Sequence, residues 1–334
     1  CDQFPLDDKI CSLVRYAVWS MENRLHPKPD AFICMMEPCD GQVMLHQAFK
    51  RSDYLKDVPC FAFDPSYGHE DKDFEYVARQ LRQEMVPFLE RTTGAKYDFK
   101  RVAELVEETN KQYRIWAEVN EQLRASPCPM PSFAVPDAFW ALTQHLPAGH
   151  PTATAIMQGA LDFAKHNVAN HVGPVMNEQI RILWPDLNPL WGDKLGAWLA
   201  SEWNAVVVQT FQGGTPYTDV DTSNEEAMFF GLARRAVAEV PMIRQGRGWV
   251  DVFEEDVTKM INEFNINAVV FPGHMGHKDQ SGSGEFLKRI CRDMDVPLIN
   301  MTTSLFDERY TPLDKVKNDL SNFFSASGFK RAKH

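Results

Sequence analysis

The chain has 334 residues, of which 44% are hydrophobic and 24% charged, as in a globular protein that buries its own core. A net charge of −11 without a basic run argues against a nucleic-acid partner, and no apolar run approaches the roughly 18 residues that cross a bilayer. The start at Cys1 has no signal-peptide pattern and no initiator Met. We therefore expect a cytoplasmic protein with further residues upstream of Cys1.

The sequence lacks the motifs of several common enzyme and metal-binding classes. Its seven cysteines are widely spaced without a CxxC pair, which argues against a disulfide framework, a zinc ribbon and a thioredoxin motif. A GxSxG elbow, a GxxxxGK[ST] phosphate loop, an HExxH motif and a GxGxxG fingerprint are also absent. We expect Cys34, Cys60 and Cys291 to be core residues, and Cys128 to be a surface or packing residue.

The N-terminal part of the chain has an incomplete α/β pattern. The apolar runs Ala31–Met36 and Phe61–Phe63 predict strands, and apolar residues at helical spacing predict a helix over Lys72–Thr92 that ends at Gly94. Two strands make a small sheet. We therefore expect further strands upstream of the given sequence, or support from the rest of the chain, in a lobe of residues 1–97.

The middle of the chain is mostly helical. A strong helical pattern over Phe99–Leu123 is followed by the Pro-rich stretch Ala125–Pro136 and by a second helical pattern within Phe139–Val175. Together these segments predict a helical connector over residues 98–176.

The last part of the chain, residues 177–334, alternates between short apolar segments and helical patterns. The predicted strands are Ile180–Trp184, Ala205–Thr210, Asn267–Phe271 and Pro297–Met301. The predicted helices are Pro189–Trp203, Val250–Phe264, Gly284–Met294 and Leu313–Phe324. This alternation predicts a parallel sheet with helices on both faces, so the chain is expected to form two α/β lobes.

Chemically active side chains lie where predicted strands end or helices begin, and ligands of parallel sheets bind at the carboxyl ends of strands. Cys11 opens a predicted helix, where unpaired amides stabilise a thiolate, and Cys39 follows the first predicted strand. His274 and His277 follow the strand Asn267–Phe271 in a Gly-rich loop, where His274 has the alternative of bonding a neighbouring backbone group. The amides ahead of Gly284 are a further candidate site for a phosphate or carboxylate.

Several segments follow one another in a recognisable order. They are CSLVR at Cys11–Arg15, CDG at Cys39–Gly41, VPCFAFDP at Val58–Pro65, FLERTTGAKYD at Phe88–Asp98, AELVEETNKQYRIW at Ala103–Trp116, HMGHKDQSG at His274–Gly282 and the ending Val296–Phe324. This set, which spans nearly the whole chain, resembles the family of 2-hydroxyacyl-CoA dehydratases and ATP-dependent benzoyl-CoA reductases. The order of the segments is more specific than any single motif.

The resemblance implies two flavodoxin-like lobes joined by a helical connector, with a 4Fe-4S cluster held by three cysteines in the cleft between the lobes. It also implies a heterodimer with a homologous second subunit. An ATP-dependent activator would supply single low-potential electrons, and a CoA thioester would react through a ketyl-type radical. We expect neither nucleic acid nor a membrane as a partner.

Carried over by position, Cys11 and Cys39 match the first two cluster cysteines, whereas His277 stands at the place of the third. Imidazole can replace thiolate on an iron-sulfur cluster and raises its reduction potential. Three interpretations stay open: His277 binds the cluster, another nearby residue does, or the metal is lost and His274 and His277 donate protons or contact the substrate. Ser281 either bonds the thioester carbonyl or caps the next helix.

The changed third ligand suggests a specialised subunit. We therefore favour an iron-sulfur subunit of a benzoyl-CoA reductase-like enzyme, which performs ATP-driven radical reduction of an aromatic acyl-CoA thioester in anaerobic aromatic degradation. The first alternative is a subunit of a 2-hydroxyacyl-CoA dehydratase, which removes water from its substrate. The second alternative is a cluster-free scaffold subunit of such a complex.

Overall fold

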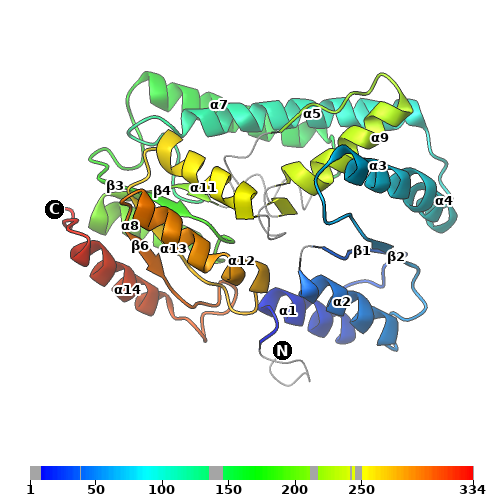
Figure 1. The fold of residues 1–334 in the computed structure, drawn as a ribbon, viewed down its shortest axis with the longest axis horizontal. Coiled ribbons are helices and arrows are strands. Elements are labelled where there is room, and N and C mark those ends of the chain that lie inside the picture. Colours follow the sequence, from blue (N-terminus) through cyan, green and yellow to red (C-terminus); the bar gives the residue numbers. More distant parts are fainter. Residues whose placement is uncertain are drawn as a thin grey trace. The chain divides into compact units, whose positions relative to one another are not determined.

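The computed structural model describes residues 9–37, 39–134, 146–210, 217–240, 243–244 and 250–333, without the side chains of residues 279 and 280. The chain divides into two compact units (Figure 1). Unit 1 contains residues 1–104, 218–247 and 275–279, and unit 2 contains residues 105–217, 248–274 and 280–334. Each unit is therefore assembled from separate stretches of sequence. The predicted lobes and connector, with boundaries at residues 97 and 176, are consecutive segments of the chain. The two units combine separate segments and so do not test these boundaries, which stay a prediction.

Unit 2 is built on a parallel sheet whose strands match the predicted ones to within one residue at each end. Among the described residues, its strands are β3 (Ile180–Trp184), β4 (Ala205–Thr210), β5 (Ala268–Phe271) and β6 (Leu298–Asn300). All pairings are parallel and the strand order is β4-β3-β5-β6. Counted within the unit, this order is 2-1-3-4, which is the flavodoxin-like arrangement. The predicted α/β fold is confirmed.

The strands of this sheet are apolar because most of them have no solvent-facing side. Every residue of β3, β4 and β5 is buried, whereas the edge strand β6 is partly exposed. Parallel strands covered on both faces carry continuous rather than alternating apolar residues. This is why short apolar runs located the strands so closely.

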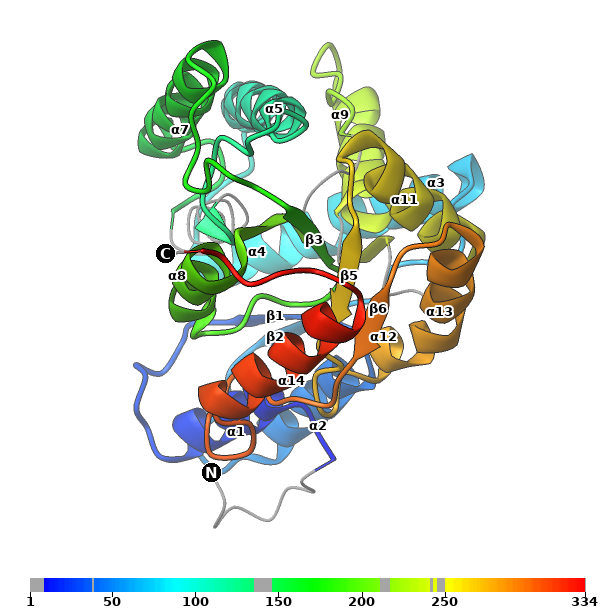
Figure 2. The same ribbon diagram turned by 90° about the vertical axis from the view of Figure 1, so that its left-hand side faces the viewer.

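Helices cover both faces of the sheet of unit 2 (Figure 2). They are α5 (Phe99–Gln122), most of which belongs to unit 2, α7 (Pro151–Ala169), α8 (Gly192–Trp203), α11 (Val250–Glu263), α13 (Gly284–Asp293) and α14 (Leu313–Ala326). One hydrophobic cluster joins β3, β4 and β5 to α5, α7, α11 and α13. On the other face, α8 and α14 meet through Trp203 and Phe324, whose ring centroids are 5.2 Å apart.

The predicted helices of unit 2 are confirmed with small shifts at their ends. The pattern over Pro189–Trp203 placed the start of α8 three residues too early. The helix begins at Gly192, and Trp191 is its N-cap residue. The helical pattern within Phe139–Val175 contains α7, and residues 139–145 of that prediction lie outside the described residues.

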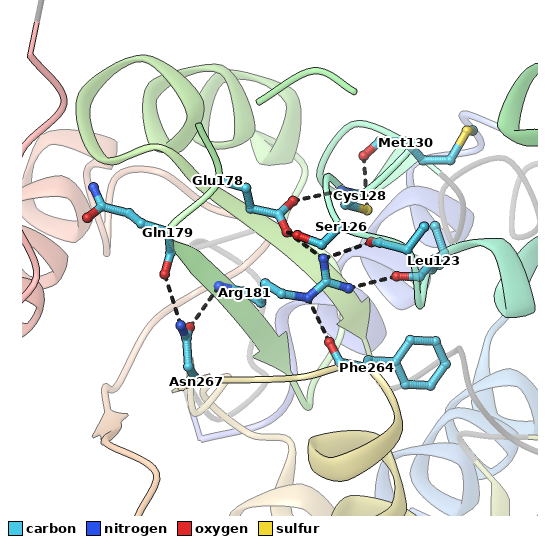
Figure 3. Close-up of polar contacts among 10 residues, drawn as sticks. Leu123, Ser126, Cys128, Met130, Glu178, Gln179, Arg181, Phe264 and Asn267 are labelled. Carbon is cyan, nitrogen blue, oxygen red and sulfur yellow. Dashed lines mark hydrogen bonds and ion pairs between the residues drawn. The ribbon is translucent and has the colours of Figure 1, made fainter. Parts of the chain in front are cut away.

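A buried arginine joins the connector to the amino end of the sheet (Figure 3). The Arg181 guanidinium donates from Nε to the carbonyl of Phe264 at 2.7 Å and from Nη2 to that of Leu123 at 2.8 Å. Its Nη1 donates to the carbonyl of Ala125 at 3.0 Å and to Oε1 of Glu178 at 2.5 Å. Only 6% and 3% of the Arg181 and Glu178 side chains are exposed. Four of the five N–H groups of the guanidinium therefore have acceptors, which offset the cost of burying its charge.

The residues around this ion pair extend the same network. The second carboxylate oxygen of Glu178 accepts the backbone N–H of Cys128 at 2.8 Å. Asn267, which precedes β5, accepts the backbone N–H of Arg181 at 2.8 Å and donates to the carbonyl of Gln179 at 2.9 Å. These contacts fix an irregular segment of the connector, which has no regular secondary structure of its own to satisfy its carbonyl groups.

Unit 1 contains a parallel pair of strands among its described residues, β1 (Phe32–Met35) and β2 (Cys60–Phe63). Its helical elements are α1 (Ser12–Glu22), α2 (Asp40–Arg51), α3 (Asp71–Gln80), α4 (Val86–Thr93), α9 (Glu225–Arg234) and the π-helical η1 (Leu81–Met85) and η2 (Arg235–Glu239). One face of the strand pair packs in a cluster with Phe49 of α2. On the other face Phe61 meets Phe88 of α4, with ring centroids 5.5 Å apart.

The single helix predicted over Lys72–Thr92 is wrong in detail. The segment runs as α3, η1 and α4, and the π-helical turn in the middle cannot be recognised from apolar spacing. The predicted end is confirmed, since Gly94 follows α4 in the left-handed conformation with φ of 71°. The predicted loop after β5 contains a short helix, α12 (Lys278–Gly282), where the chain passes from unit 1 to unit 2. None of the helices in the described ranges is long and apolar enough to span a bilayer.

Candidate functional site

Two predicted ligands stand at the N-termini of adjacent helices in unit 1. Cys11 and Cys39 are the N-cap residues of α1 and α2, and their carbonyls accept the N–H groups of Arg15 and Gln42 at 3.1 Å each. Cys11 is buried and Cys39 is half-buried. The amides of a first helical turn and the helix dipole favour a thiolate at both positions. The predicted helix start at Cys11 and the predicted position of Cys39 after a strand are confirmed.

Small residues allow these two helix starts to lie against each other. A Cβ atom on Gly41, in the first turn of α2, would lie 3.1 Å from Cγ2 of Val14 in α1 and 3.3 Å from Sγ of Cys39. The first turn of α1 therefore lies beside the Cys39 thiol, and a larger residue at Gly41 would push α2 away.

The third predicted segment, around His277, contacts the backbone of Cys11. Gly276 has φ of 79°, and a Cβ atom on it would lie only 2.3 Å from the backbone nitrogen of Cys11. His277 follows directly and is 6% exposed. The ammonium of Lys278 pairs with the carboxylate of Asp40 at 2.6 Å, and these residues directly follow His277 and Cys39. Unit 1 thus brings together the three segments that carry the predicted ligands.

The donor set suits an iron-sulfur cluster in the kind of its donor atoms. Two thiols at helix N-termini and one imidazole are donors that such clusters accept. In the described ranges, however, no three His, Cys, Asp or Glu side chains already surround a common metal position. The Gly276 and Cys11 segments therefore meet through their backbones, and the Cys39 segment meets them through Gly41, Val14 and the Lys278–Asp40 pair, whereas no arrangement of side chains around a metal is established.

His274 belongs to unit 2, whereas His277 belongs to unit 1. His274 is 1% exposed; its Nδ1 accepts the backbone N–H of Leu305 at 3.1 Å, and its ring meets Phe306 edge-on with centroids 5.1 Å apart. Because Nδ1 is an acceptor, the neutral imidazole carries its proton on Nε2. The two histidines of one short loop therefore have separate environments.

Asp186 is a functional candidate that the sequence did not single out. It is fully buried just after β3; its Oδ1 accepts the N–H of Leu187 at 2.7 Å and its Oδ2 that of His274 at 3.3 Å. Asp186 and His274 follow β3 and β5, the neighbouring strands at which the strand order reverses and where ligands bind in such sheets. The sequence signal that could have identified Asp186 is its position, because it is a carboxylate two residues after the end of the predicted strand Ile180–Trp184.

Ser281 is exposed within α12. The alternative that it caps the next helix is wrong, because the N-cap of α13 is Ser283, and Ser283 makes no side-chain cap bond. A contact between Ser281 and a thioester stays a prediction.

Among the other described cysteines, Cys34, Cys128 and Cys291 are core residues, whereas the expectation of a core residue is met only in part for Cys60. Burial raises the pKa of both the Cys128 and the Cys291 thiol to about 12, so they stay protonated at neutral pH. Cys34 is buried, as expected, and Cys60 is half-buried. Cys128 is therefore a packing residue rather than a surface residue.

A cavity of about 530 Å³ lies between β6 and α14 in unit 2. Its charged lining residues, Lys315 and Asp319, pair with each other at 2.6 Å. None of the predicted site residues lines this cavity.

Comparison with models of protein families identifies a relationship over nearly the whole chain. A family model described as 2-hydroxyglutaryl-CoA dehydratase, D-component, matches residues 2–324 of the chain. No curated protein matches the sequence.

Proposed function

Because the chain belongs to the family of the 2-hydroxyglutaryl-CoA dehydratase D-component, we propose that it is a subunit of a multi-subunit enzyme that acts on a 2-hydroxyacyl-CoA thioester. A homologous second subunit and an ATP-dependent activator are its proposed partners. In this proposal Cys11, Cys39 and His277 hold a 4Fe-4S cluster. When bound, the cluster supplies single electrons to the thioester.

The contact of three sequence-distant segments in unit 1 is the observation that supports this proposal. The backbone of Gly276 lies against that of Cys11, and the Lys278–Asp40 ion pair joins the residues that follow His277 and Cys39. The segments that meet there are the ones that carry the two thiols and the imidazole of the proposed ligand set. Helix N-termini at both thiols lower the free energy of their ionised forms, which are the forms that bind iron.

His274 is assigned a different role from that of His277. Its Nδ1 is occupied by the N–H of Leu305, so its exchangeable proton is held at Nε2. Loss of a hydroxyl group as water requires a proton, and a neutral imidazole can deliver one near neutral pH. We therefore assign His274 to proton delivery, with Ser281 as a candidate contact of the thioester carbonyl.

The aromatic reduction favoured from the sequence remains the second candidate. The observation for it is the imidazole of His277 in place of a third thiolate, which marks a specialised subunit. However, an imidazole ligand raises the reduction potential of a cluster and so lowers its driving force toward an aromatic ring. For this physical reason, and because the family supports a dehydratase-like complex, we propose dehydration as the first candidate.

Anaerobic purification of the chain with its partner subunit, followed by iron and sulfide analysis, tests the ligand assignment. We expect iron in the wild type and its loss in Cys11→Ala, Cys39→Ala and His277→Ala. Cys291→Ala is the matched control, because that thiol is buried in α13, which belongs to none of the three segments. Wild-type protein without iron would leave the cluster-free scaffold as the explanation.

A turnover assay separates the two activities. With the cognate activator and ATP, we expect a 2-hydroxyacyl-CoA to lose water and benzoyl-CoA to remain unchanged. Reduction of benzoyl-CoA without dehydration would reverse the order of the two candidates.

A further inference from the structure

Two cysteines that the proposed site does not use face each other in unit 1. In the parallel pair of β1 and β2, Cys34 is opposite Ala62 and Phe32 is opposite Cys60. Side chains two residues apart on a strand point to the same face. Cys34 and Cys60 therefore project from one face of the sheet on neighbouring strands, and their sulfur atoms are 3.6 Å apart.

The environment of this pair is apolar on one side and accessible on the other. Cys34 is 5% exposed in a cluster with Phe49, Leu55 and Val58, whereas Cys60 is only half-buried at the start of β2. Burial, and then the hydrogen bond and charge of Cys60, raise the pKa of Cys34 to about 12, while the Lys50 ammonium acts in the opposite direction. Cys60 is thus the more exposed residue of the pair, and Cys34 is the buried one beside it.

We propose that Cys34 and Cys60 form a dithiol that a hydroperoxide converts into an intrachain disulfide. The sulfur of Cys60, after loss of its proton, attacks the O–O bond of ROOH, forming a sulfenic acid and releasing the alcohol ROH. The sulfur of Cys34 then attacks the sulfenic sulfur, an S–S bond replaces the S–O bond, and water leaves with the Cys34 proton. In sum, two thiols are oxidised by two electrons and ROOH is reduced to ROH and water.

The distance and the position of the pair favour this reaction over separate oxidation of each thiol. A disulfide bond is about 2.05 Å long, so the two sulfur atoms have to approach by about 1.5 Å from their present separation. Cys60 is the first residue of β2, where a strand can shift with the loss of few ladder bonds. By comparison, Cys128 and Cys291 are both buried, and the Cys128 thiol donates to the carbonyl of Met130 at 3.5 Å.

The modification would affect the segment that leads to Cys39. β1 ends at Met35, a few residues before Cys39 opens α2. A disulfide at Cys34 would tie this strand covalently to β2 on the approach to that residue. The reaction itself needs no cluster, so it can be tested on metal-free protein, and its failure is distinguishable from failure of the proposed cluster.

The test is peptide mapping of the full chain after oxidation. Reduced protein is treated with hydrogen peroxide, denatured, alkylated to label the remaining thiols, and digested. Trypsin leaves Cys34 and Cys39 in one peptide, because the cleavable bonds nearest to them follow Arg24 and Lys50. Cyanogen bromide cleavage after Met35 and Met36 separates them, so that the partner of Cys60 can be assigned.

We expect a linked pair of peptides that contain Cys34 and Cys60, a mass lower by two hydrogen atoms, and reversal by dithiothreitol. Cys34→Ser and Cys60→Ser should each reduce this linked pair to background, and Cys291→Ser should leave it unchanged. Two results would overturn the proposal: full alkylation of both thiols after peroxide treatment, or conversion of Cys60 to sulfinic acid without a link to Cys34.

Discussion

Lys278 and Asp40 pair at 2.6 Å, although 238 positions separate them in the sequence. Both side chains are 62% exposed, and an ion pair so exposed contributes between zero and about 1 kcal/mol. The ion pair therefore shows that the two segments are in contact, but it contributes little to the free energy that keeps them together. The close approach of Gly276 to Cys11 is the stronger constraint, because it is a contact between backbones.

Replacing Gly276 with alanine should destabilise this junction strongly. A Cβ atom would stand 2.3 Å from the backbone nitrogen of Cys11, and φ of 79° is itself unfavourable for alanine. We expect a loss of about 3 kcal/mol in the free energy of unfolding by urea titration, together with loss of iron. Gly94→Ala is the matched control, since Gly94 has φ of 71° with nothing within 4 Å of its Cβ position. It should cost only about 1 kcal/mol. Equal losses would show that backbone conformation, rather than the contact with Cys11, dominates.

Breaking the buried ion pair of unit 2 should be costly. Arg181→Met leaves Glu178 buried without its cation and three carbonyl groups without their donor, so we expect a loss of about 3–5 kcal/mol. Adding Glu178→Gln should recover part of this loss, because the carbonyl groups still lack a donor. Lys315→Met, which breaks the exposed pair with Asp319, should cost less than about 1 kcal/mol. Full recovery in the double variant would assign the whole effect to the stranded carboxylate. Urea titration of all three variants decides between these outcomes.

His46 should make the stability of the protein depend on pH. It is 5% exposed, and neither ring nitrogen has a hydrogen-bond partner within the described part of the chain. Burial, and secondarily the charge of Lys50, lower the pKa of His46 in the folded state. In the unfolded chain His46 therefore becomes protonated as the pH falls below about 6.5, whereas in the folded chain it stays neutral to a lower pH. Stability should be complete above that pH and should fall as the pH decreases toward the folded-state pKa, by at most about 1.4 kcal/mol per pH unit.

His46→Leu should remove that pH dependence and raise stability by about 1 kcal/mol at pH 7, since it replaces two buried unpaired polar atoms. The exposed His26 provides the control, and His26→Leu should change neither quantity. Urea titrations at pH 5.5, 6.5 and 7.5 measure both effects. A slope that persists in His46→Leu would assign the pH dependence to other groups.

His277→Cys tests the proposed third ligand directly. If imidazole binds the cluster, a thiolate in its place should keep the iron and lower the reduction potential by an amount on the order of 100 mV. His166→Cys, at an exposed position of α7, introduces the same residue elsewhere and should leave the potential unchanged. Potentiometric titration compares the two variants, and an unchanged potential in His277→Cys argues against ligation by His277.

The local elements were predictable from the sequence where burial imposes a clear pattern. β3 and β4 match Ile180–Trp184 and Ala205–Thr210 at both ends, because strands buried on both faces carry mostly apolar residues, with Arg181 of β3 as a hydrogen-bonded exception. α9 and η2 were not predicted, although Phe229, Ala233 and Val237 recur four residues apart and Asn224 is a residue that favours a helix start. The spacing of apolar residues indicates which face of a helix or strand is buried, but it does not identify the element that packs against this face.

The arrangement of the candidate site was predictable only in part. The positions of Cys11 and Cys39 follow from local signals, namely a helix start and a strand end. The separation of His274 and His277 does not, because each histidine is placed by residues far away in the sequence, such as Leu305 for His274. The sulfur contact of Cys34 with Cys60 depends likewise on the register of β1 against β2, which neither strand encodes alone.

Asp186, His274 and Leu305 lie in the loops that follow three adjacent strands, and each is bonded to the next in series. Asp186 holds the backbone of His274, and the ring of His274 holds the backbone of Leu305. The loops after β3, β5 and β6 are thereby linked mechanically. A ligand that displaces any one of them must move or break a bond to its neighbour, so these three loops should respond to binding together.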